Sequence, residues 1–199
     1  GHTNTIGDNE DPKDAPFLVL DEPNDPVVRV EAGNAHSCAL LASGRMFCWG
    51  SNDFGKLGNW AGGVKVGDNE PPNPAGAVKV LGLGDQVLEM ALGNEHTCVR
   101  LPAGKVRCWG GSPEGQLGAG NTSSLGGSPG QMAPFVDLGG SVLDLAAGIQ
   151  HACALLSGGR VRCWGYNQFG MLGIGTTQNI GDNPGEMPPQ DAFLYTKPK

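Results

Sequence analysis

Apolar and polar residues alternate with a period of two along several short runs of this chain. The first such run is Val27–Ala32, where Val28 and Val30 are expected to face inward and the residues between them outward. This period predicts a half-buried β-strand. Later runs repeat the pattern, with Glu89 and Asp144 expected to face outward. The apolar residues expected to face inward in those runs are Leu88, Met90, Leu143 and Leu145.

The neighbouring segments complete a structural unit. A strand such as Phe17–Leu20 precedes the first run. Two more strands, Ser37–Leu41 and Arg45–Trp49, follow it and are joined by a short loop that contains glycine. No segment carries a sustained apolar stripe of helical period. Four strands and no helix in a unit of this size predict a blade of a β-propeller.

One sequence motif occurs three times. It reads GNAHSCALLASGRMFCWGSNDFGKLG from Gly33, GNEHTCVRLPAGKVRCWGGSPEGQLG from Gly93 and GIQHACALLSGGRVRCWGYNQFGMLG from Gly148. A residue type that recurs in every copy belongs first to the packing of the repeat. The residues to which we therefore assign blade packing are His36, His96, His151, Trp49, Trp109 and Trp164.

The repeats predict an all-β fold of three four-stranded antiparallel blades, as an incomplete propeller or part of a larger ring. Three blades cannot close a ring. The strand at 192–196 resembles Phe17–Leu20, and we expect it to pair with a neighbouring molecule or with further repeats, so that the chain self-associates or belongs to a larger ring. The expected divisions are a preceding loop plus the first strand of blade one at 1–26, blade one with its long loop at 27–76, blade two with its loop at 77–134, blade three with its loop at 135–191, and an extra terminal strand at 192–199.

Each copy carries two cysteines ten residues apart. The loop Ala42–Gly44 sets a hairpin register in which Cys38 lies opposite Cys48, within disulfide distance. Three such local pairs indicate an oxidising compartment. The predicted disulfides are Cys38–Cys48, Cys98–Cys108 and Cys153–Cys163.

Two other interpretations of the cysteines remain open. They could be reduced, buried thiols. Alternatively, His-x-Cys and the later cysteine could hold zinc, although a fourth ligand is missing from every copy. We expect the repeated histidines instead to hydrogen-bond the backbone at blade turns.

The motifs Gly-x-x-His-x-Cys-Ala-Leu, Gly-Arg-Val-x-Cys-Trp-Gly and Asn-x-x-Gly-x-Leu-Gly together resemble the repeat of the regulator of chromosome condensation family. The cysteine-bearing form is similar to the repeats of secreted or cell-surface bacterial members. The resemblance implies a β-propeller, commonly of seven blades, in which the histidine and the Trp-Gly pair serve blade packing. Functions in the family include nucleotide exchange on GTPases, chromatin binding, light sensing and protein scaffolding, so the fold alone does not identify the function.

Composition disfavours several of these functions. The net charge is −7 and the basic residues are scattered, which argues against a nucleic-acid partner. Light sensing would need clustered tryptophans, and only Trp60 lies outside the repeated position. A GTPase partner is not expected in an oxidising compartment. The chain has no apolar run of 18 residues, so no transmembrane segment is expected.

Gly-Asp-Asn recurs in the long loops and has two interpretations. It is strong turn chemistry, because glycine supplies a positive φ while Asp and Asn bond their own backbone. It could also be a weak calcium site, since these side chains offer oxygen ligands. The second repeat lacks both residues, which argues against an obligatory role. The candidate calcium residues are Asp8, Asn9, Asp68, Asn69, Asp182 and Asn183.

Familiar catalytic motifs are missing from the sequence, and every cysteine has a predicted partner, so no thiol nucleophile remains. We expect no catalytic residue, metal or cofactor. The predicted function is a non-catalytic binding or scaffold module, secreted, periplasmic or on the cell surface, whose propeller loops meet a protein, peptide or glycan. The alternative is an accessory or substrate-recognition domain of an enzyme such as a hydrolase, with its chemistry outside this chain.

Overall fold

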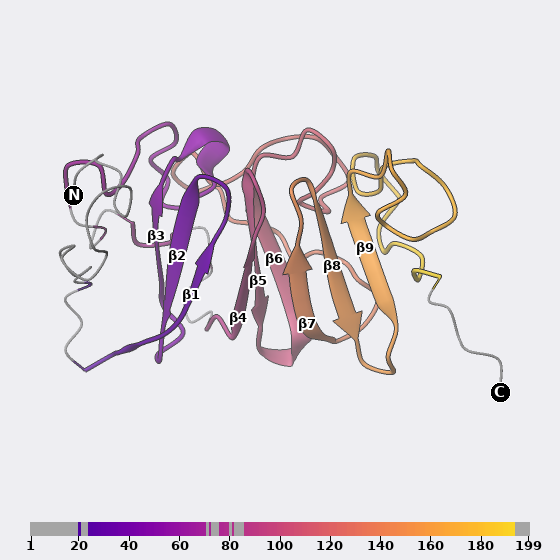
Figure 1. Cartoon of the computed structure of the whole chain (residues 1–199), viewed down its shortest axis with the longest axis horizontal. Coiled ribbons are helices and arrows are strands. Elements are labelled where there is room, and N and C mark those ends of the chain that lie inside the picture. Colours follow the sequence, from indigo (N-terminus) through magenta and orange to yellow (C-terminus); the bar gives the residue numbers. More distant parts are fainter. Residues whose placement is uncertain are drawn as a thin grey trace, which may run out of the picture.

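The computed structural model of the chain describes residues 20, 24–70, 72, 76–79, 81 and 86–193. These residues form three antiparallel sheets of three strands that stand side by side in chain order (Figure 1). The all-β, incomplete-propeller prediction is confirmed. Blade one contains β1 (Val27–Ala32), β2 (His36–Leu41) and β3 (Met46–Gly50); blade two contains β4 (Glu89–Leu92), β5 (His96–Leu101) and β6 (Lys105–Gly110); blade three contains β7 (Val142–Ala147), β8 (His151–Leu156) and β9 (Val161–Gly165).

The expected fourth strand of each sheet is reduced to one β-bridge. Ala77 bridges Phe47, and Phe135 bridges Arg107 in the same way. A glycine or proline lies one or two residues before each bridging residue: Gly76 and Pro134 come directly before Ala77 and Phe135, and Pro189 lies two residues before Asp191, which bridges Arg162 in blade three. Proline cannot donate to a ladder and glycine weakens one, so the pairing does not extend. Of the expected strand Phe17–Leu20, only Leu20 is described, and it packs on blade one.

The C-terminal segment also departs from expectation. Asp191 bridges Arg162, and the amide of Ala192 donates to the carbonyl of Val161. Residues 191–193 are therefore attached to blade three of their own chain. The remainder of that predicted strand lies outside the described residues.

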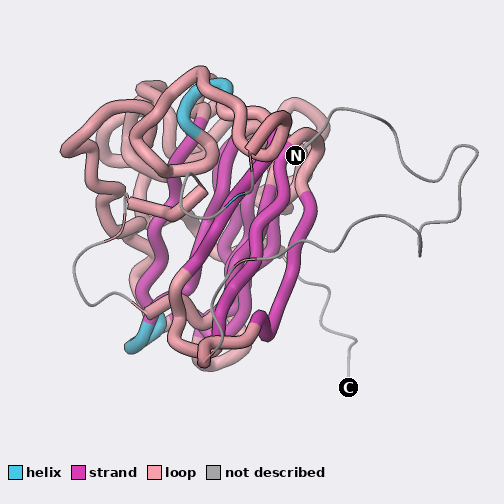
Figure 2. Tube along the Cα trace, turned by 90° about the vertical axis from the view of Figure 1, so that its left-hand side faces the viewer, coloured by secondary structure: helices cyan, strands magenta, loops and turns pink. Residues whose placement is uncertain are grey.

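The two ends of the sheets differ in construction. The loops after β3, β6 and β9 all lie at the upper end in Figure 1, and Figure 2 shows them layered above the strands. We call this end the loop face and the opposite end, which carries the tight hairpins, the hairpin face. The 3-10 turn η2 (Asp53–Gly55) belongs to the loop face and η3 (Pro102–Gly104) to the hairpin face. The loop face comprises residues 33–35, 51–70, 93–95, 111–131, 148–150 and 166–187, and the hairpin face residues 42–45, 102–105 and 157–160.

The core lies between blades, because each sheet packs one face on each neighbour. Met90 and Trp109 of blade two are buried against blade one, and Leu145 and Trp164 of blade three are buried against blade two. Both faces of β4, the inner strand of blade two, are covered, so the simple inward and outward assignment does not hold there. Glu89, expected outward, is buried, whereas the expected inward residues Val28, Val30, Leu88 and Leu143 are exposed.

Candidate functional site

The three predicted disulfides are present. In each hairpin the two cysteines are directly opposed, as Cys38 and Cys48 are, so the strand register sets the pairing. Cys98–Cys108 and Cys153–Cys163 repeat the arrangement. No cysteine in the described part of the chain is free. The zinc and reduced-thiol interpretations are therefore wrong.

The first repeated histidine lies at the junction of blades one and two. The imidazole Nε2 of His36 is 2.9 Å from the hydroxyl of Thr97, which donates to the backbone carbonyl of Lys56 at 3.0 Å. We expected His36 to hydrogen-bond the backbone of a turn. The bond is instead made to a side chain of the next blade. Burial lowers the pKa of His36 to about 4, and the positive charge of Lys56 acts in the same direction.

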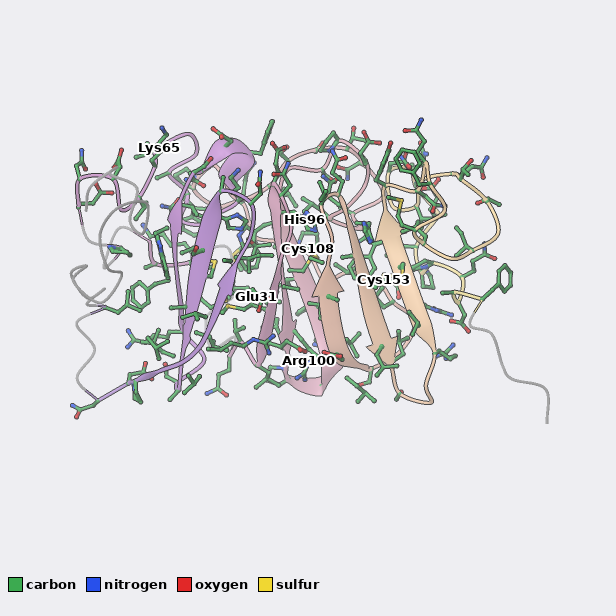
Figure 3. All side chains as sticks on the ribbon, in the orientation of Figure 1. Glu31, Lys65, His96, Arg100, Cys108 and Cys153 are labelled. Atoms are coloured by element: carbon green, nitrogen blue, oxygen red, sulfur yellow. A yellow bond between two sulfur atoms is a disulfide. The ribbon has the colours of Figure 1, made fainter. Side chains whose placement is uncertain are left out.

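The second histidine occupies the equivalent junction of blades two and three without such a partner. Within the described residues, neither ring nitrogen of His96 has a hydrogen-bond partner. The position of Thr97 is taken there by Ala152, which has no hydroxyl. Burial lowers the pKa of His96 to about 3, with His36 and His151 adding unfavourable charge. His96 is labelled in Figure 3, near the loop ends of the strands.

The repeated tryptophans link neighbouring blades. The indole nitrogen of Trp109 donates to the carbonyl of Lys56 at 3.0 Å, and that of Trp164 donates to the carbonyl of Gln116 at 2.9 Å. Both rings are fully buried, whereas Trp49 is only partly buried. A buried ring that bonds the preceding blade offers no platform to a ligand.

The motif Asn-x-x-Gly-x-Leu-Gly shapes the start of the long loops of blades one and three, and serine replaces the asparagine in blade two. The side-chain oxygen of Asn52 accepts the amide of Leu57 at 3.0 Å, and Asn167 accepts that of Leu172 in the same way. Gly55 has a positive φ and lies so close to the loop of the next blade that a Cβ would be 2.3 Å from the amide nitrogen of Gly127. Glycine is needed here for both reasons, and the loops of successive blades are locked together.

The Gly-Asp-Asn turns are closed by an acceptor from their own loop. Glu70 accepts the amide of Gly67, and Glu186 accepts those of Gly181 and Asn183. Gln131 takes this place in the second loop. Burial and the neighbouring Glu186 raise the pKa of Asp182. In the described ranges no three His, Cys, Asp or Glu residues are grouped so that they could hold a metal ion, and Asp8 and Asn9 lie outside those ranges.

Charge is distributed unevenly between the two ends. The loop face carries seven carboxylates against Lys56, which is buried, and Lys65. At the hairpin face, Arg45, Lys105 and Arg160 occupy equivalent positions in the three hairpins. Figure 3 shows Lys65 at the upper end and Arg100 at the lower end. The seven carboxylates of the loop face belong to Asp53, Asp68, Glu70, Glu95, Glu114, Asp182 and Glu186.

Exposed aromatic rings accompany these carboxylates. Phe54 is 52% exposed and adopts a φ of 60°, and Phe169 is 82% exposed. Tyr166 packs edge-on against Phe169. Sequence reasoning missed this combination, although the segment between Trp-Gly and Leu-Gly supplies an acidic and an aromatic residue in the first repeat, an acidic residue in the second and two aromatic residues in the third.

The inner strands carry an ionic cluster that spans the blades. Glu89 accepts a 2.7 Å hydrogen bond from Arg100 and lies 3.8 Å from Arg29. Burial raises the pKa of Glu89, while its bond to Arg100 opposes the rise and the nearby Asp144 adds to it. Asp144 takes the position of Glu89 in blade three. The ion pairs therefore join blades one and two, and Asp144 of blade three places a second carboxylate near them.

The loop ends of β1, β4 and β7 surround a cavity of about 450 Å³. Asn34 and Asn94 are joined across it by a 2.6 Å hydrogen bond, and Ile149 takes the equivalent position in blade three. The walls are otherwise glycine and small apolar residues, so the cavity offers no pair of catalytic groups. No described helix is long and apolar enough to cross a membrane.

Consecutive blades of this kind, with loops gathered at one face, define a propeller-type repeat protein. A model described as the regulator of chromosome condensation (RCC1) repeat matches residues 27–56, 87–116 and 142–170, and a second model of that description matches residues 43–100. The chain belongs to the RCC1 repeat family.

Among its relatives is the human X-linked retinitis pigmentosa GTPase regulator, which is 30% identical over 157 residues. The match covers 79% of this chain and 14% of the relative. The ultraviolet-B receptor UVR8 of Arabidopsis thaliana is 33% identical over 167 residues, covering 81% of this chain and 35% of the receptor. This chain thus corresponds to a minor part of the relatives it matches.

Solved structures show the same fold at lower identity. Prp20p of Saccharomyces cerevisiae superposes with a TM-score of 0.64 at 18% identity, and human WBSCR16 with 0.62 at 22%. Each match covers 79% of this chain and 37% of the solved chain. Besides a GTPase regulator and an ultraviolet-B receptor, the relatives include proteins named as probable E3 ubiquitin-protein ligases, such as human HERC4.

Proposed function

We propose that this chain is an extracytoplasmic, non-catalytic binding module whose loop face receives a protein or peptide with a basic segment. The observation that carries the proposal is the concentration of carboxylates on that face. A surface of one sign attracts a partner of the opposite sign and raises the rate of encounter. The binding or regulatory roles of RCC1-repeat relatives support a protein partner.

The loop face also has the rigidity that recognition requires. The bonds of Asn52 and Asn167 hold the loops, and the close approach of Gly55 to Gly127 locks one loop to the next. Exposed rings such as Phe54 supply apolar contact area beside the carboxylates. Loops held by a rigid scaffold are the usual location of binding residues.

The proposed location outside the cytoplasm rests on the three disulfides, because such bonds persist in oxidising compartments. In such a compartment the partner would be another secreted or surface protein.

A pair of synthetic peptides tests the charge argument. An oligo-lysine peptide should bind the chain, with an affinity that falls as salt is added, and an oligo-glutamate peptide of equal length should not. Calorimetry of the double variant Asp53→Asn with Glu95→Gln should show several-fold weaker binding to oligo-lysine.

The matched control removes two carboxylates away from the loop face, Glu31→Gln with Asp137→Asn. It has the same net charge as the test variant and should bind as the unchanged chain does. Equal weakening in both double variants, or equal binding of both peptides, would refute a specific acidic loop face.

A further inference from the structure

One exposed aromatic residue of the loop face has an unusual backbone conformation. Phe54 adopts a φ of 60°, in the left-handed region that residues other than glycine seldom occupy because of its steric cost. The equivalent residues of the other repeats, Glu114 and Phe169, do not have a positive φ. The surrounding fold therefore holds Phe54 in a conformation that its residue type disfavours. Backbone strain of this kind is concentrated at functional sites.

The ring of Phe54 lies beside a carboxylate of the next blade. A Cβ placed on Gly111 would be 3.4 Å from Cγ of Phe54 and 3.4 Å from Oε2 of Glu95. Because Gly111 has no side chain, nothing at that position separates the ring from the carboxylate. The amide of Gly111 donates to the backbone carbonyl of Glu95 at 2.7 Å, which fixes the segment that carries the carboxylate. The ring and the carboxylate thus meet at the internal junction of blades one and two.

Both groups are open to a ligand. The Phe54 side chain is 52% exposed, and in the part of the chain that the structure describes the carboxylate of Glu95 makes no hydrogen bond or ion pair. The ring of Phe135, by contrast, has the guanidinium of Arg107 at 4.0 Å from its centroid and the ammonium of Lys105 at 4.6 Å. Among the described residues, no such cation lies over the ring of Phe54.

The second internal junction lacks this pair of groups. Glu114 takes the position of Phe54 there. Gln150, whose side chain is uncharged, takes that of Glu95. The carboxylate of Glu114 also has a partner already, since it accepts a 2.7 Å hydrogen bond from Asn179. An open ring beside an unpaired carboxylate is therefore found at the first junction and not at the second.

We propose that Phe54 and Glu95 form a binding site for an arginine side chain in the basic segment of the partner. A guanidinium stacks on an aromatic ring and donates two parallel hydrogen bonds to a carboxylate, whereas an ammonium group is a point charge without that planar geometry. Asp53, which is exposed and precedes Phe54, adds negative charge nearby. The inference rests on the proposed function, because it names the side chain that the loop face recognises.

Oligo-arginine and oligo-lysine peptides of equal length test the inference, because they carry the same charge. In calorimetry at one salt concentration, the unchanged chain should bind oligo-arginine about two- to fivefold more tightly than oligo-lysine. Phe54→Leu removes the aromatic ring and no charge. It should lower the affinity for oligo-arginine by about the same factor and leave the affinity for oligo-lysine nearly unchanged. Because Phe54 is exposed, the variant should fold, as circular dichroism would verify.

Two further variants show whether the ring and the carboxylate bind the same group. The double variant Phe54→Leu with Glu95→Gln should lose less affinity for oligo-arginine than the product of the two single losses, since both residues contact one guanidinium. Phe135→Leu is the matched control. It removes a partly exposed ring away from the loop face and should keep the full preference for arginine.

The outcomes separate this inference from the proposed function. If neither peptide binds the unchanged chain, the acidic loop face fails as a binding surface and the arginine site fails with it. If both peptides bind with equal affinity, the loop face stands and the arginine site is overturned. The site is also overturned if Phe54→Leu weakens both peptides equally, if Phe135→Leu has the same effect as Phe54→Leu, or if the losses in the double variant multiply.

Discussion

The junction of blades one and two and the junction of blades two and three are built from the same repeat positions, but their buried polar groups are hydrogen-bonded differently. Both place an indole N–H on a carbonyl of the preceding blade. Only the first gives its histidine a hydroxyl partner, because Thr97 is replaced by Ala152 in the second. The indole bond is therefore the constant link between blades, whereas the imidazole mainly fills space beside the glycine that precedes it.

The largest expected effect comes from removing the constant link. Trp109→Ala leaves a cavity in the first junction and should lower the free energy of unfolding by about 3–5 kcal/mol. Trp49→Ala should cost less, since that ring is only partly buried. Urea unfolding of the two variants measures the difference. Equal losses would show that the ring stabilises its own blade and not the junction.

Acid should weaken both junctions through their histidines. His36 and His96 are neutral in the folded chain, with pKa values of about 4 and about 3, against about 6.5 when unfolded. Below about pH 6.5 the unfolded chain therefore binds protons that the folded chain does not. Each histidine should lower the free energy of unfolding by up to about 1.4 kcal/mol per pH unit. This loss of unfolding free energy should continue as the pH falls toward the folded-state pKa values. Above about pH 7 it should be absent.

Urea unfolding at pH 7.5, 6.0 and 5.0 measures this slope. His96→Asn should remove its own contribution and flatten the slope, while those of His36 and of His151, whose pKa burial also lowers, remain. The raised pKa of Glu89 acts in the opposite direction at lower pH, since a carboxyl that holds its proton more tightly when folded stabilises the fold in acid. An unchanged slope in the His96 variant would contradict the prediction.

The smallest effect exchanges the residue that distinguishes the junctions. Thr97→Ala strips His36 of its partner and should cost about 1–3 kcal/mol, the usual penalty for an unpaired buried polar group. Ala152→Thr offers His96 a hydroxyl and should gain about 0.5–1.5 kcal/mol. Ser37→Ala, at the same repeat position in blade one, is the control and should change little. A loss on Ala152→Thr would mean that the second junction has no room for the added atoms.

Local features of this fold could be predicted from the sequence, whereas contacts between blades could not. The spacing of Cys38 and Cys48 and the short loop between their strands determine one hairpin, so register and disulfide follow from neighbouring residues. The burial of Glu89 depends on Arg29 and Arg100 from other strands. His96 lacks a hydrogen-bond partner because the residue 56 positions later, Ala152, has no hydroxyl. Comparing the residues that follow the three repeated histidines would have indicated this difference from the sequence.

The disulfides also limit how far the chain can be stretched. Each one joins residues ten apart on adjacent strands, so tension applied to the two ends passes through the cross-link and not around the hairpin. Ten extended residues span about 33–36 Å, and each oxidised blade therefore withholds roughly 30 Å of extension. With all three disulfides intact, the stretched chain has a shorter maximum end-to-end length than the reduced chain. The redox conditions of the surroundings therefore set that length.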